Sequence, residues 1–135
     1  MTYYGLLYVS KSCLEPARAT EQVEQIVSAS MARNLALDVT GALIFTGKYF
    51  AQRLEGPKAS IDALMYSINA DERHEGIRLI DQGPIEARAF SRWSMAYSGQ
   101  SSFVENHIIA SFTASKNALR TEAIRLIRLM REFQH

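Results

Sequence analysis

The segment VTGALIFTGKYFAQRLEGP, residues 39–57, decides the fold. Two apolar-rich runs, residues 39–45 and 49–55, flank the short connection Thr46-Gly47-Lys48. A Gly-containing connection of this length between two such runs is typical of a β-hairpin. The segment therefore predicts two adjacent antiparallel strands that end at Gly56-Pro57.

Strand and helix patterns alternate on both sides of this hairpin. Residues 3–10, rich in Tyr, Leu and Val, predict a strand buried on both faces, and a helix is expected to start near Thr20. The inward stripe of that helix is Val23, Ile26, Val27, Ser30, Met31 and Asn34. A second helix after Pro57 carries Ile61, Leu64, Met65 and Ile68 and is expected to end near Asp71. Residues 77–82 and 93–98 predict two more strands, separated by a break at Gly83-Pro84.

The resulting order is βαββαββ, in which two right-handed crossovers place both helices on one face of a single sheet. The sequence therefore predicts an α+β fold, a ferredoxin-like sandwich. Two short amphipathic helices, interrupted around residues 113–115, are expected to pack on the other face, on a neighbouring chain, or on both. Their apolar positions are Phe103, Val104, Ile108, Ile109, Phe112, Leu119, Ile124, Ile127, Met130 and Phe133. We expect a core domain over residues 1–98 and a helical extension over residues 99–135.

Composition narrows the class of protein. Fifteen Lys and Arg against fourteen Asp and Glu give no one-sided basic field, so nucleic-acid binding is not expected. The single cysteine, Cys13, excludes an internal disulfide, and no Cys/His cluster has metal-ligand spacing. No apolar run approaches the roughly 18 residues of a membrane-spanning helix. These features predict a cytoplasmic protein without a metal.

Three polar side chains occupy positions where the pattern calls for apolar ones. Gln52 lies between Phe50 and Leu54 on one face of its strand, Asn34 lies on the inward helix stripe, and Tyr8 shares a strand face with Leu6. A buried amide without a partner costs about 1–3 kcal/mol, so each needs one. Taken singly they are ordinary core residues bonded to backbone; together they describe an amide-and-phenol lining for a planar, polar ligand.

Two further groups have a simple structural explanation. Trp93 and Met95 share one face of the last strand, continued by Tyr97, and by default they pack the core. Arg73 and His74, in the charged sequence Asp71-Glu72-Arg73-His74, are most simply solvated charges at the end of the second helix.

The residues and their spacing resemble the BLUF family of flavin-binding blue-light sensors over residues 3–97. The resemblance rests on six separated pieces in order: Leu6–Ser10, Arg33-Asn34, Val39–Leu43, Phe50–Gly56, Asp71–His74 and Arg88–Met95. Asp38, Val39 and Ala42 depart from the family pattern, in which Gly, Ile and a larger aliphatic residue are frequent at these positions. The departures leave Tyr8, Asn34 and Gln52 in place.

The resemblance implies a flavin between the two helices, with Asn34 at the pyrimidine edge of its ring and Gln52 between Tyr8 and the flavin. In the family, the excited flavin takes an electron and then a proton from the tyrosine, and recombination leaves the glutamine rotated or tautomerised in a red-shifted state. Trp93 and Met95 would relay this change to the C-terminal helices; which of them occupies the pocket in the dark stays open. Arg73 and His74 are carried over as contacts to the flavin side chain.

The family resemblance thus implies a photoreceptor and not an enzyme, with FAD as the usual flavin and FMN or riboflavin left open. Output is expected through protein contacts, including homo-oligomerisation and a downstream partner that the sequence does not identify. Two alternatives remain at this point. One is a ligand-free interaction module, and the other is an acylphosphatase-like hydrolase, disfavoured because Lys11–Glu15 replace the Gly-rich loop that it needs.

Overall fold

The computed structural model describes residues 3–134 and contains the predicted elements in the predicted order. The first part comprises β1 (Tyr3–Ser12), η1 (Pro16–Arg18), α1 (Ala19–Ala36), β2 (Thr40–Phe45), β3 (Tyr49–Gly56), α2 (Lys58–Ala70), β4 (His74–Ile85) and β5 (Trp93–Ser98). The C-terminal part comprises α3 (Ser102–Thr113), η2 (Lys116–Ala118) and α4 (Leu119–Phe133). Within residues 3–134, every helix is too short or too polar to span a lipid bilayer.

The strands form one sheet in the order β4-β1-β3-β2-β5. The β2–β3 hairpin is antiparallel, with Leu43 opposite Gln52, and β3 pairs antiparallel with β1, where Tyr8 lies opposite Gln52. β4 pairs antiparallel with β1 and β5 pairs parallel with β2, so these two strands form the edges. The prediction of a ferredoxin-like α+β sandwich is confirmed.

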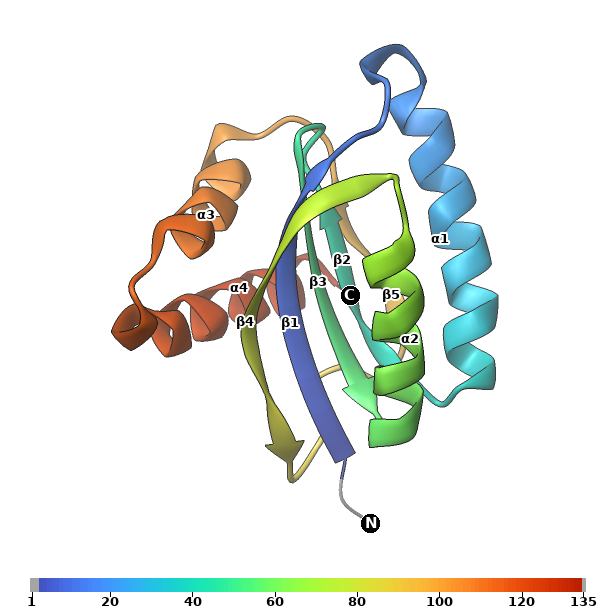
Figure 1. Cartoon of the computed structure of the whole chain (residues 1–135), viewed down its shortest axis with the longest axis vertical. Coiled ribbons are helices and arrows are strands. Elements are labelled where there is room, and N and C mark those ends of the chain that lie inside the picture. Colours follow the sequence, from blue (N-terminus) through green and yellow to red (C-terminus); the bar gives the residue numbers. More distant parts are fainter. Residues whose placement is uncertain (1–2, 135) are drawn as a thin grey trace.

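Each face of the sheet carries its own layer of helices, with α1 and α2 on one side and α3 and α4 on the other (Figure 1). Leu6 and Tyr8 of β1 belong to the apolar cluster beneath α1 and α2. Leu7 and Val9 belong to the cluster beneath α3 and α4. This division confirms that β1 is buried on both faces, because successive side chains of a strand point to opposite sides.

The structure corrects two predictions about the edge strands. β4 continues through the predicted break at Gly83-Pro84, since a proline is tolerated in an edge strand whose amide face is not needed for pairing. In β5, the pairing register with β2 shifts between Met95 and Tyr97. This bulge turns Tyr97 away from the face of Trp93 and Met95 and into the cluster beneath α3 and α4.

The helices also differ in detail from the predicted stripes. Helix α1 starts at Ala19, close to the expected Thr20, and Arg18 is its N-cap after a short 3-10 turn. Met31 is 48% exposed, and Phe103 and Ile124 are 64% and 47% exposed. In α4 the buried apolar residues are Ala123, Leu126, Leu129 and Met130, so the prediction is confirmed at Met130 and otherwise lies about one position away. Helix α4 has one broad apolar face, so its sequence alone does not fix which part of that face is buried.

Asp38 joins α1 to β2 in a backbone conformation that L-residues seldom adopt. Its φ is +59°, in the left-handed region, directly after the helix C-cap Leu37. The frequent Gly of the BLUF pattern at this position has a physical reason, since Gly adopts this conformation without a steric penalty. Asp38 instead makes an ion pair with Arg88 at 3.1 Å on the surface.

Two substitutions at Asp38 isolate the backbone effect, because both remove the ion pair with Arg88. We expect Asp38→Val to have a free energy of unfolding lower than that of Asp38→Gly by about 1–2 kcal/mol, the cost of left-handed backbone for a residue with a Cβ. Urea unfolding of the two variants measures this difference. Equal stabilities would show that the backbone relaxes out of the left-handed region.

Candidate functional site

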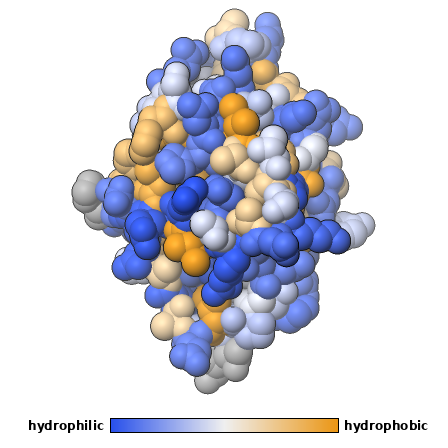
Figure 2. Space-filling model, turned by 90° about the vertical axis from the view of Figure 1, so that its left-hand side faces the viewer, coloured by the Kyte–Doolittle hydropathy of each residue, from blue (hydrophilic) through white to orange (hydrophobic). Residues whose placement is uncertain are grey.

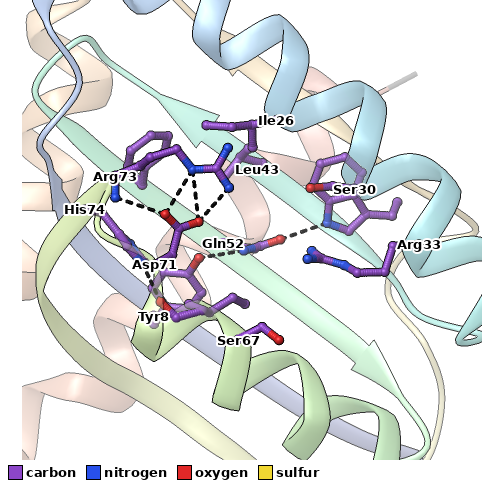
Figure 3. A pocket seen from close by; sticks show the side chains of 13 residues that line it. Tyr8, Ile26, Ser30, Arg33, Leu43, Gln52, Ser67, Asp71, Arg73 and His74 are labelled. Carbon is purple, nitrogen blue, oxygen red and sulfur yellow. Dashed lines mark hydrogen bonds and ion pairs between the residues drawn. The ribbon is translucent and has the colours of Figure 1, made fainter.

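A cavity of about 280 Å³ lies between the sheet and the helices α1 and α2 (Figure 3). Its volume is close to the lower end of the roughly 300–1,000 Å³ typical of small-molecule sites. Its walls come from all five strands, both helices and the turn after α2. The lining residues are Tyr8, Ile26, Ser30, Arg33, Leu43, Phe50, Gln52, Ser67, Ile68, Asp71, Arg73, His74 and Trp93.

A buried hydrogen-bond triad of Tyr8, Gln52 and Trp93 lines this cavity, and Figure 3 shows Tyr8 and Gln52 side by side in it. The Gln52 Nε2 atom donates to the Tyr8 hydroxyl at 2.6 Å, and the Trp93 indole Nε1 donates to Gln52 Oε1 at 3.0 Å. Cross-strand pairing produces this contact, because Tyr8 and Gln52 are direct partners in the β1–β3 ladder. The structure thus brings together three of the predicted residues.

The indole fixes the orientation of the Gln52 carboxamide. An indole N–H can only donate, whereas an amide has a donor and an acceptor end and a phenol can do either. The atom of Gln52 that faces Trp93 must therefore be the oxygen. The NH₂ group is then directed at Tyr8, whose hydroxyl serves as the acceptor.

Tyr8 keeps its proton across the physiological pH range. Its side chain is buried, and this burial raises the pKa of Tyr8 well above the ordinary value. The hydrogen bond from Gln52 acts in the opposite direction with a smaller effect on that pKa. The cavity floor is consequently neutral.

The charged end of the cavity is formed by the turn between α2 and β4. Arg73 donates to both carboxylate oxygens of Asp71, with the closest contact at 2.6 Å. The Arg73 guanidinium holds the pKa of Asp71 below its usual range. Both residues line the cavity, so the predicted charge cluster is partly a wall of the site and not only solvated surface.

His74 begins β4 with both ring nitrogens engaged. Its Nε2 lies 2.8 Å from the Ile68 carbonyl oxygen, and its Nδ1 lies 2.8 Å from the Ser10 hydroxyl. A carbonyl accepts only, so Nε2 donates to Ile68, whereas the Ser10 hydroxyl, which can donate or accept, bonds Nδ1. His74 therefore ties α2 to β1 and presents its ring to the cavity.

Asn34 is fully buried at the end of α1, as predicted, but it is not among the residues that line the cavity. Its Oδ1 accepts a hydrogen bond of 3.4 Å from Arg33 Nε, and its Nδ2 has no protein partner. The neighbouring Arg33 does line the cavity. A buried amide donor left free beside a cavity is a feature expected of a ligand site, because an unmet donor is costly.

Met95 was predicted as a site residue, and several residues that line the cavity were not. Met95 packs against the same apolar cluster but does not line the cavity, so Trp93 holds that place here. The sequence analysis assigned no site role to Arg33, Asp71 or Ser67, although Arg33 and Asp71 lie in pieces of the family resemblance. Ser30 carried a usable signal, since it is a small polar residue on the inward stripe of α1, as Asn34 is.

Fold and site together define a small-molecule-binding α+β sandwich in which a phenol, an amide and an indole meet beside a cavity. Residues 3–96 match the model of the BLUF family, described as sensors of blue light using FAD. The chain belongs to this family, and the expected class, flavin-binding blue-light sensing with FAD as cofactor, is confirmed. The ligand-free module and the hydrolase are not supported.

Curated relatives carry the same domain in longer proteins. The chain is 35% identical over 89 residues to the blue light- and temperature-regulated antirepressor BluF of Escherichia coli (strain K12), covering 64% of this chain and 22% of that protein. It is 32% identical over 91 residues to the photoactivated adenylate cyclase subunit alpha of Euglena gracilis, covering 67% of this chain and 9% of that protein. The chain therefore spans less than a quarter of either relative.

Solved structures extend the likeness to the C-terminal helices. The dark-state structure of BlrB, a BLUF protein, is 31% identical with a TM-score of 0.69, and the match covers 96% of both chains. The photo-activated state of BlsA, at 20% identity, has a TM-score of 0.76 and covers 96% of this chain and 94% of that one. The second match shows the shared fold only.

The residues present fit FAD. The cavity offers a neutral polar floor and apolar walls from Ile26 and Leu43, and Asn34, next to the lining residue Arg33, has a free buried amide donor at Nδ2. A flat ring with a polar edge needs such a combination. The charged groups Arg33, from α1, and Arg73, from the turn after α2, both line the cavity and suit the anionic part of a dinucleotide.

The raised pKa of Tyr8 predicts how stability depends on alkaline pH. The unfolded chain releases this proton near pH 10, whereas the folded chain retains it to higher pH. The contribution of Tyr8 to the free energy of unfolding is therefore fully present below about pH 10. Above that pH it falls by up to about 1.4 kcal/mol per pH unit. Tyr8→Phe should lack this loss, as measured by urea unfolding at about pH 8 and about pH 11. A Tyr66→Phe control, which removes an exposed phenol, should behave as the wild type; an identical loss in Tyr8→Phe would contradict the prediction.

Proposed function

We propose that this chain senses blue light by a change in the Tyr8–Gln52–Trp93 triad. FAD, when bound, supplies the absorption of blue light and a ring that accepts an electron. Tyr8 is the buried protonated phenol beside that ring, and Gln52 is the amide that stores the result as an altered hydrogen-bond pattern. The observation that carries this proposal is the triad itself, which is neutral, buried and adjacent to the cavity.

The Gln52 amide can take two orientations within the triad, and only one of them keeps the hydrogen bond to Trp93. In the structure, Gln52 Nε2 donates to Tyr8 and Gln52 Oε1 accepts from Trp93. Rotating the amide would let the Tyr8 hydroxyl donate to Oε1, because a phenol serves either role. The same rotation would set Nε2 against the Trp93 N–H, donor against donor. The rotated state therefore requires Trp93 to move away from Gln52, and this couples the amide to β5.

The remaining predicted site residues hold the cofactor. We propose that Asn34 donates from its free Nδ2 to the polar edge of the ring. Arg33 and Arg73, which line the cavity, serve the side chain and phosphates of FAD, and His74 orients the turn that carries Arg73. Met95 is a relay residue that packs beside Trp93 on the face of β5 toward the cavity.

The chain is proposed to act through protein contacts and not by turning over a substrate. Residues 1–98 form the sensing domain and residues 99–135 the cap and output element, since α3 and α4 cover the sheet face opposite the cavity (Figure 1). Figure 2 shows this side of the molecule, where apolar areas are separated by hydrophilic ones. Self-association through exposed residues such as Phe103 and Ile124 stays a prediction, and light scattering tests it. A location in the cytoplasm also stays a prediction.

Tyr8→Phe separates binding from photochemistry. We expect the variant to retain FAD, because it loses one hydroxyl and little volume, and to lose the red shift on blue-light illumination. Dark-minus-light absorption spectra of the FAD-loaded protein measure this shift. Tyr66→Phe, an exposed control on α2, should keep the full shift. A normal red shift in Tyr8→Phe, or none in the wild type, would refute the proposed role.

Asn34→Ala tests the cofactor contact. Loss of the amide removes one buried donor to the ring, so the dissociation constant for FAD should rise by about fivefold to tenfold, the effect of one hydrogen bond of about 1 to 1.4 kcal/mol. Equilibrium dialysis against FAD measures it. Asn106→Ala, on the exposed side of α3, is the matched control and should bind FAD normally. Unchanged affinity of Asn34→Ala would place the residue outside the binding site.

A further inference from the structure

The C-terminal end of α4 is attached to β5 directly behind Trp93. Gln134 Nε2 donates to the Ser94 hydroxyl at 2.5 Å and to the Gly41 carbonyl oxygen at 3.1 Å. We propose that Ser94 and Gln134 form a latch that holds the end of α4 on β5 while Trp93 bonds Gln52, and that opens when Trp93 leaves. The inference rests on the proposed function and names the residues that carry its signal across the sheet.

Because side chains alternate along β5, the Trp93–Gln52 bond and the Ser94–Gln134 bond lie on opposite faces of the sheet at neighbouring residues. Trp93 belongs to the cluster beneath α1 and α2, and the next residue, Ser94, points to the opposite face, where Gln134 meets it. Gly41, the second acceptor of Gln134, is the direct β2 partner of Trp93. Gln134 therefore bonds both β2 and β5 at the position of Trp93, so its hydrogen bonds depend on the distance between the two strands there.

β5 is suited to move because it is an edge strand. It pairs with β2 only, and its first ladder position is Trp93 opposite Gly41. Withdrawal of the indole from Gln52 removes the buried bond that holds this end of the strand. A shift of the strand at Trp93 displaces Ser94 as well, since the two share a peptide plane.

A second contact limits how far α4 is released. The Tyr97 and Phe133 rings lie 5.0 Å apart between centroids, a separation typical of a packed aromatic pair. The bulge in β5 turns Tyr97 toward α4 and thereby creates this contact. Opening of the latch therefore loosens the end of α4 at its C-cap Gln134, while Phe133 keeps the helix on the sheet.

The coupling must act in both directions, because a coupling free energy between two sites is reciprocal. If moving Trp93 opens the latch, then removing the latch must favour departure of Trp93. Trp93 is the only tryptophan of the chain, so its fluorescence reports this position without ambiguity. A merely structural hydrogen bond at the end of α4 would not alter the accessibility of Trp93.

The test uses the FAD-loaded wild type, Gln134→Ala and Ser94→Ala, in the dark and under blue light. In the wild type, illumination should raise amide hydrogen exchange in residues 130–134 by about threefold to tenfold, the equilibrium factor of one net hydrogen bond. Both variants should show this faster exchange already in the dark. Both variants should still bind FAD and show a red shift on illumination, since neither side chain lines the cavity.

Acrylamide quenching of Trp93 in the dark is the second readout. Both variants should be quenched more than the wild type, and the double variant no more than either single one, because the two residues act as one unit. Ser94→Thr, which keeps the hydroxyl, should restore wild-type behaviour. Gln25→Ala, on the exposed side of α1, is the matched control.

The outcomes separate the latch from the sensor. A wild type without a red shift would refute the proposed function and the latch with it. A wild type with a red shift but no light-dependent exchange in residues 130–134 would refute the latch alone. Unaltered Trp93 quenching in Gln134→Ala would likewise overturn it, as would equal effects in Gln25→Ala.

Discussion

A tryptophan N–H that can only donate fixes the arrangement at the centre of this protein. It forces the oxygen of Gln52 toward β5 and leaves the NH₂ group for Tyr8. Because all three groups are buried, no water competes for these bonds, and each partner would lose a costly interaction if left unpaired. The site therefore has one favoured arrangement, and a second becomes accessible only when the indole is displaced.

The sheet makes this arrangement possible by burying both of its faces. Tyr8 and Gln52 come from neighbouring central strands and point into the layer beneath α1 and α2, while Leu7 and Val9 of the same strand are covered by α3 and α4. Hydrogen-bonded pairing with a strand on each side limits how far the two central strands can adjust. A rearrangement at Gln52 is consequently transmitted to the edge, where β5 has a neighbour on one side only.

Much of the fold was accessible from the sequence, because hairpin, strand alternation and crossover rules act locally. The features that were missed depend on tertiary partners. The turn of Tyr97 toward α4 follows from a bulge set by pairing with β2, and the buried side of α4 follows from its fit to the sheet. In the site, Gln52 and Tyr8 were found because they break an apolar pattern. Arg33 and Asp71 break none, since charges at helix ends are ordinary.

The position of the polar residues also explains why a signal would leave through β5 and not through β1 or β3. Tyr8 and Gln52 lie on strands flanked by others on both sides, so their displacement would break two ladders. Trp93 lies at the start of a short edge strand, where displacement disturbs one ladder and the contacts of Ser94 and Tyr97 with α4. Trp93 is thus the least constrained member of the triad, and its strand is also the one joined to the C-terminal helix. A rearrangement of the triad is therefore expected to pass from the cavity face through β5 to α4 on the other face of the sheet.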